Sequence, residues 1–161
     1  MSESEPPRDL AAAQEIAADS AAGYQAIGRF MVDFSGLELM MRVVLGKRLN
    51  LKGAYFDIVV SPYDFATLCR VTSAVLRLQF PEQTADIDKF VNDCLKLNDE
   101  RVRVAHGTWA LGDDFMFARH VQRATLKPKL HFKERDALSK LAEEAQRLSV
   151  LVFKWNPQTA D

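Results

Sequence analysis

Two residues near the end of one apolar helical pattern carry side chains suited to chemistry on a phosphodiester. They are Arg101 and His106, in the stretch NDERVRVAHGTW at positions 98–109. An imidazole titrates near neutral pH and can move a proton to or from a ribose 2′-hydroxyl or a leaving oxygen. A guanidinium can hold non-bridging phosphate oxygens through two hydrogen bonds. Chemistry of this kind needs no metal ion, so we expect no metal and no other cofactor.

Arg101 occupies a position that would otherwise be part of the core. When the helix is projected at ~100° per residue, its apolar stripe runs through Ile87, Val91, Cys94, Asn98, Arg101 and Ala105. Burial of an unpaired guanidinium costs several kcal/mol, so we expect Arg101 to be paired, to lie at a dimer contact, or to face a wet cleft with an anionic ligand. Glu38 is the candidate partner, and an Arg101–Glu38 pair that ties two helices together is the structural alternative.

His106 follows Arg101 by five residues, which is about 7.5 Å along an ideal helix and ~140° around it. The two side chains therefore do not share one face within a single chain. Two copies related by a two-fold axis could instead line one cleft with this pair. Asn98 and Arg103 are further candidates for substrate binding. The alternative interpretation treats His106 as an ordinary surface histidine and Arg103 as a solvated charge.

A second basic region follows this helix. The segment between Phe115 and Lys133 contains no acidic residue, and its basic residues are Arg119, His120, Arg123, Lys127, Lys129, His131 and Lys133. Arg123, Lys127 and Lys129 are candidates for binding an RNA backbone, since such contacts release counterions. The alternative is a solvated loop.

The composition predicts one globular domain. The chain has 161 residues, of which 48% are hydrophobic, and this is enough to bury a core. Its net charge of -1 gives no general attraction to polyanions, so a site for RNA must be local. Residues 1–7 are polar and predict a disordered tail, and no apolar run approaches the ~20 residues of a membrane span. We expect a cytoplasmic protein with no membrane contact, in which Cys69 and Cys94 are reduced core thiols.

Hydrophobic periodicity predicts the elements that must position these residues. Helices are expected at about 10–20, with an interruption at Gly23, and then at 26–49, from 65 to Pro81, from Pro81 to Gly107, and from about Lys133 to Pro157. The segment 56–60 predicts a short strand or buried loop, and alternation at 108–111 and 115–118, around Gly112–Asp114, predicts a β-hairpin. The fold class is therefore all-α: a helical bundle of about five helices with a small β-hairpin inserted before the last helix, in one domain over 8–157.

The spacing of Arg101 and His106, at the end of a late helix and followed by Gly107 and Trp109, resembles the Arg-x4-His signature of HEPN domains. A long helix reading FSGLE at 34–38 precedes the motif, and the resemblance covers about residues 22–155. It implies a helical homodimer in which both motifs face a shared cleft. It also implies metal-independent endoribonuclease activity in stress response or defence, with His106 in proton transfer and Arg101 on the phosphate.

One residue of the motif departs from the pattern of catalytic HEPN members. Val102 stands where those members often carry Asn, Asp or His, and a valine cannot donate or accept a hydrogen bond. The alternative is therefore a non-catalytic module of the same fold that binds RNA or a protein partner.

Overall fold

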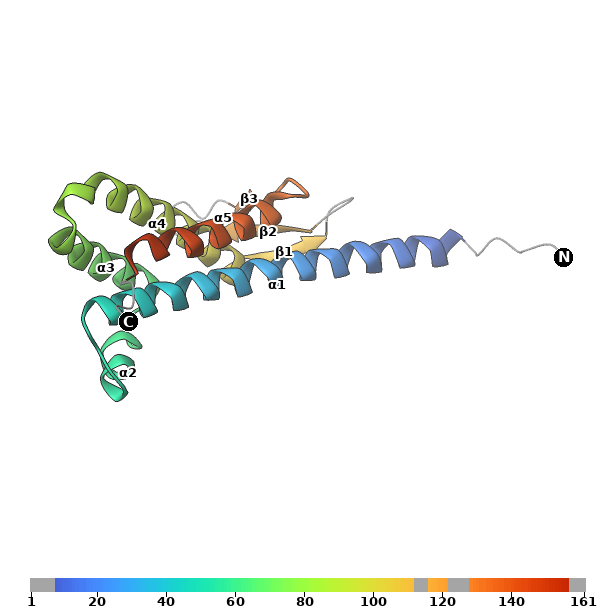
Figure 1. The fold of residues 1–161 in the computed structure, drawn as a ribbon. Helices are drawn as coiled ribbons and strands as arrows, with labels where there is room; N and C mark the ends of the chain where they lie inside the picture. The colour runs from blue at the N-terminus through green and yellow to red at the C-terminus, as the bar shows by residue number, and fades with distance from the viewer. Residues whose placement is uncertain (1–7, 112–115, 122–127, 157–161) are drawn as a thin grey trace.

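The structure is a computed structural model that describes residues 8–111, 116–121 and 128–156. Its α-helices are α1 (Arg8–Arg48), α2 (Ala54–Val60), α3 (Phe65–Gln79), α4 (Thr84–His106) and α5 (Ala137–Leu151). Two 3-10 turns, η1 (Pro81–Gln83) and η2 (Val152–Trp155), follow α3 and α5. A small antiparallel sheet of β1 (Thr108–Leu111), β2 (Met116–Val121) and β3 (Pro128–His131) precedes α5 (Figure 1). The prediction of a helical bundle with a small β insertion before the last helix is confirmed.

The long helix α1 is continuous over 41 residues, so the predicted interruption at Gly23 is wrong. A Cβ atom placed on Gly23 would lie 2.5 Å from Sδ of Met116, the first residue of β2. Gly23 therefore serves the close approach of the sheet to the helix and does not break the helix. Figure 1 shows that α5 and the sheet lie along one side of α1, whose N-terminal turns extend beyond them.

The segment at 56–60 is part of a helix, so the predicted strand or loop is wrong. In α2, Phe56 is half-buried and Val60 is buried, while Asp57 and Ile58 are exposed. An i,i+4 pair of inward residues is the helical pattern, and it is too short here to be distinguished from a strand by sequence alone. The ring of Phe56 packs on Gly46 of α1 so closely that a Cβ atom there would collide with it.

The core lies between α1, α3, α4 and α5. Phe34 of α1 packs on Phe65 of α3 with ring centroids 4.6 Å apart, and Phe90 of α4 packs on Trp155 at 5.2 Å. Most predicted core positions are buried, but Leu49 is 40% exposed because α1 has already ended at Arg48.

Cys69 and Cys94 are buried free thiols, as predicted. Their mutual contact and their burial raise the pKa of the Cys94 thiol far above its usual range. The Cys94 thiol therefore stays protonated and unreactive inside the core.

The predicted hairpin is confirmed, and it gains a third strand. Thr108 pairs with Arg119 and Leu111 with Met116, while Arg119 also pairs with Leu130 of β3. Since β3 takes up 128–131, α5 begins at Ala137 rather than near Lys133. The predicted turn at Gly112–Asp114, the strand residue Phe115, the tail 1–7 and the helix stop at Pro157 lie outside the described residues.

Within the described ranges, no helix has both the length and the mean hydropathy that a bilayer span requires. Helix α1 has 41 residues, but charged residues recur along its length.

The contact between Gly46 and Phe56 gives a stability prediction. We expect Gly46→Ala to lower the free energy of unfolding by about 1–3 kcal/mol, because the new methyl group must displace the Phe56 ring. In a Phe56→Leu background the same change should cost much less. Urea unfolding of the four proteins measures this coupling, and equal costs in both backgrounds would contradict the packing described.

Candidate nucleic-acid interface

After Cys94, the buried face of α4 passes through other residues than the sequence predicts. Leu97 and Val104 are buried on it, whereas Ala105 is exposed and Asn98 is half-buried, so the expected continuation through Ala105 is wrong. Helix α4 has 23 residues and its neighbour α3 has 15, so the last turns of α4 extend beyond the start of α3.

Arg101 lies half-buried between Leu97 and Val104 on this stripe. Its Cζ atom is 5.9 Å from the centroid of the Phe34 ring, which is a cation–π contact between α4 and α1. The Nε atom is buried and has no hydrogen-bond partner within residues 8–111, 116–121 and 128–156. Among the residues that the structure describes, no carboxylate forms an ion pair with Arg101.

Glu38 pairs with Arg42 and not with Arg101, so the pair between α1 and α4 that formed the structural alternative is not present. The Arg42 Nη2 atom lies 2.5 Å from Oε1 of Glu38, one turn away on the same helix. The same guanidinium donates to the carbonyl oxygens of Val60 and Tyr63, the latter at 2.8 Å. Arg42 thus fixes the α2–α3 connection to α1, and this leaves Glu38 committed within its own helix.

His106 is the last residue of α4 and is exposed. Trp109 fixes the chain directly after it, because the indole Nε1 donates to the carbonyl oxygen of Val104 at 3.0 Å and the ring stacks on Phe132. Gly107 has a φ of -72°, so it is not needed for a left-handed conformation. A Cβ atom there would lie 3.0 Å from Cβ of Ala118, so glycine allows β2 to approach the end of α4.

The remaining predicted site residues are divided between two elements. Arg103 pairs with Glu100 on its own helix, and Asn98 is half-buried one turn before Arg101. Lys129 is exposed on β3, opposite His120 of β2. Arg123 and Lys127 lie outside the described residues.

Arg119 is a site candidate that the sequence analysis counted only within the basic region. It is exposed on β2, and its backbone is paired with Thr108, two residues after His106. The register of the hairpin places it there. Sequence alone could not specify this register, because a shift by one residue would have placed Ala118 opposite Thr108.

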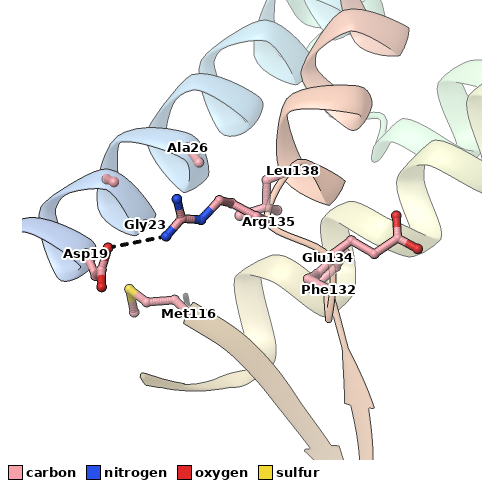
Figure 2. A pocket seen from close by; sticks show the side chains of 9 residues that line it. Asp19, Gly23, Ala26, Met116, Phe132, Glu134, Arg135 and Leu138 are labelled. Atoms are coloured by element: carbon pink, nitrogen blue, oxygen red, sulfur yellow. Dashed lines mark ion pairs between the residues drawn. The ribbon is translucent and has the colours of Figure 1, made fainter. Parts of the chain in front are cut away.

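A separate cavity of about 150 Å³ lies where α1, β2 and the start of α5 meet (Figure 2). Asp19 and Arg135 form an ion pair of 3.7 Å across it, and Met116 lies beside Gly23. Its lining residues do not include Arg101 or His106, so it is not part of the motif. Asp19 and Arg135 are far apart in sequence, and no spacing pattern predicts their contact.

We compared the chain with protein-family models, with curated proteins and with solved structures, and none of the three comparisons found a match. The resemblance to HEPN domains therefore rests on the sequence motif.

The contrast between Arg101 and Arg42 predicts opposite effects on stability. Arg101→Met keeps the apolar length of the side chain over Phe34 and removes a buried donor that has no partner. We expect its free energy of unfolding to stay the same or to rise by up to about 1 kcal/mol. The matched variant Arg42→Met loses three hydrogen bonds to charged nitrogen and should lose about 2–3 kcal/mol. Chemical denaturation measures both, and an equal loss in the two variants would show that Arg101 serves the fold.

Proposed function

We propose that this protein is a HEPN-like, metal-independent endoribonuclease in which Arg101 binds the scissile phosphate. The observation that carries the proposal is the placement of the Arg101 guanidinium, which is half-buried against Phe34 and has no carboxylate partner among the described residues. A cation held in such a place without a counter-ion is costly unless an anion visits it. A phosphodiester supplies that negative charge and accepts hydrogen bonds from the guanidinium.

In this proposal His106 transfers the proton. As a base it would take the proton of a ribose 2′-hydroxyl; the 2′-oxygen then bonds to phosphorus while the bond to the 5′-oxygen breaks. The products are a 2′,3′-cyclic phosphate and a 5′-hydroxyl; the leaving 5′-oxygen takes its proton from water, and His106 returns its proton to solvent. His106 is exposed at the end of α4, where an RNA strand can reach it.

Within one chain Arg101 and His106 are ~140° apart around α4, so the proposed site joins residues from two copies in a homodimer. Arg119 pairs with Thr108, two residues after His106, and it is a candidate to hold the RNA strand near that point. This role would explain why an exposed arginine lies in a strand directly after the motif.

Cleavage of RNA in the presence of EDTA tests the proposal. We expect His106→Ala and Arg101→Ala each to lower the cleavage rate by about 10²-fold or more, and Arg101→Lys to recover only part of it, because lysine cannot bind phosphate through a rigid fork. Arg77→Ala is the matched control, since Arg77 forms its ion pair with Asp88 away from the motif. A substrate with 2′-deoxyribose at every position should not be cut.

Two results would contradict the proposed activity. One is cleavage of equal rate in the parent and in His106→Ala; the other is no cleavage by the parent of any RNA tested. Products that end in a 3′-hydroxyl would exclude the 2′-hydroxyl as the attacking group.

A non-catalytic RNA-binding module is the second candidate, and Val102 favours it. Val102 is 39% exposed directly after Arg101, so an apolar side chain faces solvent where a hydrogen-bonding residue would assist catalysis. In this candidate the exposed residues Arg119 and Lys129 of the sheet bind the backbone, together with Arg123 and Lys127.

This second candidate predicts binding without cleavage. The affinity for single-stranded RNA should fall as salt rises, and each lysine or arginine replaced by alanine should reduce the slope of log K against log salt by roughly 0.7. Fluorescence anisotropy with Lys129→Ala, Lys127→Ala and His106→Ala tests it. Binding that is insensitive to salt, or that depends on His106 more than on the lysines, would contradict it.

A further inference from the structure

The cavity between α1, β2 and the start of α5 is left open although the contact directly beside it is tight. Met116 packs on Gly23 so closely that a Cβ atom there would collide with it, yet about 150 Å³ next to this contact is filled by no described side chain. Protein interiors are close-packed, and a cavity of this size can hold a group as large as a benzene ring. Most of its walls are apolar and come from Ala22, Ala26, Met116, Phe132 and Leu138.

Asp19 and Arg135 place opposite charges across this cavity. The Asp19 side chain is 25% exposed and the Arg135 side chain is 73% exposed, so Arg135 lies on the solvent side. Their separation of 3.7 Å is longer than a charge-assisted hydrogen bond, and an exposed pair of this kind contributes little to stability. Contacts with a ligand can therefore replace it at small cost.

The third charged residue of the lining is engaged elsewhere. Glu134 pairs with Lys140 at 3.3 Å, and its carboxylate points away from the cavity (Figure 2). Among the described lining residues, a ligand therefore meets one carboxylate, that of Asp19, and one guanidinium, that of Arg135.

One wall residue of the cavity has a strained backbone. Phe132 has a φ of 60°, in the left-handed region that bulky residues rarely adopt. Its ring stacks on Trp109 with centroids 5.6 Å apart and planes 12° from parallel, and this contact holds it in place. Strain of this kind persists only where the surroundings fix the residue, and it is concentrated at ligand sites. The backbone of Phe132 is thus a second feature, besides the open volume, that points to a binding site.

We propose that this cavity binds a free α-amino acid with an apolar side chain of medium size, such as leucine or methionine. The apolar side chain enters the cavity, the ammonium group binds the Asp19 carboxylate, and the carboxylate binds Arg135. The two charged groups of an α-amino acid are attached to one carbon, so they match the short separation of Asp19 and Arg135. A guanidinium has five N–H donors, so Arg135 can bind the ligand while it keeps a contact with Asp19.

The pair of opposite charges selects this class over ligands with a single charge. A fatty acid would bind Arg135 but would place its carboxylate beside Asp19. An amine would bind Asp19 and place its charge beside Arg135. Both arrangements bring like charges together, which weakens binding.

The inference goes beyond the proposed nuclease and does not rest on it. Neither Arg101 nor His106 lines the cavity. We therefore expect Arg101→Ala and His106→Ala to bind leucine with the affinity of the parent, whether or not the parent cleaves RNA.

Titration of the full chain with L-leucine, followed in ¹⁵N–¹H spectra, tests the site. The chain has two tryptophans, and each indole N–H gives one signal. Trp109 stacks on the wall residue Phe132, whereas Trp155 packs on Phe90 in the core. We expect the Trp109 signal to shift saturably with a dissociation constant of about 1 mM or lower, while the Trp155 signal stays in place.

Variants of the two charged residues test the recognition of the ligand. Asp19→Asn and Arg135→Gln should each weaken leucine binding at least about tenfold, because each removes one charge-assisted contact. Asp88→Asn is the matched control, since Asp88 also pairs with an arginine of another helix, Arg77. It should bind leucine as the parent does.

Ala26→Leu tests the cavity itself and leaves both charges in place. The larger side chain should occupy the open volume and abolish leucine binding. The melting temperature should not fall, because the new atoms fill empty space. A lower melting temperature, or leucine binding that persists, would show that this volume is not the site.

Three further results would overturn the proposal. The first is no shift of the Trp109 signal with leucine or methionine at about 10 mM, tenfold above the weakest expected dissociation constant. The second is equal affinity in the parent, Asp19→Asn and Arg135→Gln. The third is binding of leucine amide, which lacks the carboxylate, or of 4-methylpentanoate, which lacks the ammonium group, as tightly as leucine.

Discussion

A half-buried arginine for which the described part of the chain supplies no carboxylate partner dominates the end of α4. Arg101 contacts the face of Phe34, and its buried Nε atom has no acceptor among the residues that the structure describes. The neighbouring Glu38 is held by Arg42, which also binds two carbonyl oxygens. The two arginines therefore differ: Arg42 makes three hydrogen bonds that tie the end of α2 and the following loop to α1, whereas Nε of Arg101 has no acceptor among the described residues. This difference is the reason for proposing that Arg101 binds an anionic ligand.

The rest of the fold places this group at the boundary between core and solvent. Helix α4 has more residues than α3, Arg101 lies half-buried in its last turns, and the sheet starts directly after His106 and Gly107. Close contacts at Gly107 and Trp109 fix where the sheet begins. Glycines have a similar role along α1, where Gly23 allows Met116 of the sheet, and Gly46 allows Phe56 of α2, to pack directly on the helix backbone. These glycine contacts therefore set the distances at which the sheet and α2 pack against α1 and at which the sheet packs against the end of α4.

Periodicity was sufficient to predict the main helices, the fold class and most of the core, because amphipathic patterns over many residues report burial directly. Periodicity failed where the same residue or short segment is compatible with two local structures. Gly23 reads as a helix breaker in sequence but serves as a contact surface, and the short segment at 56–60 fits a strand or a helix equally well. The site was harder to predict. The sequence offers Arg42 as an i,i+4 partner for Glu38, but this spacing alone does not exclude a pair with Arg101 of another helix. The register that pairs Arg119 with Thr108 depends on the turn.

The Nε–H resonance of Arg101 in an ¹⁵N–¹H spectrum gives the most direct test of the central claim. Its donor is buried and unpaired in the free protein, so a bound phosphodiester that takes up this guanidinium must change its environment. On titration with 2′-O-methyl RNA, which lacks the 2′-hydroxyl needed for cleavage, we expect a saturable shift of this signal in EDTA, while the Arg42 signal stays in place. An unchanged Arg101 signal at RNA concentrations that saturate other resonances would contradict a phosphate-binding role for this residue.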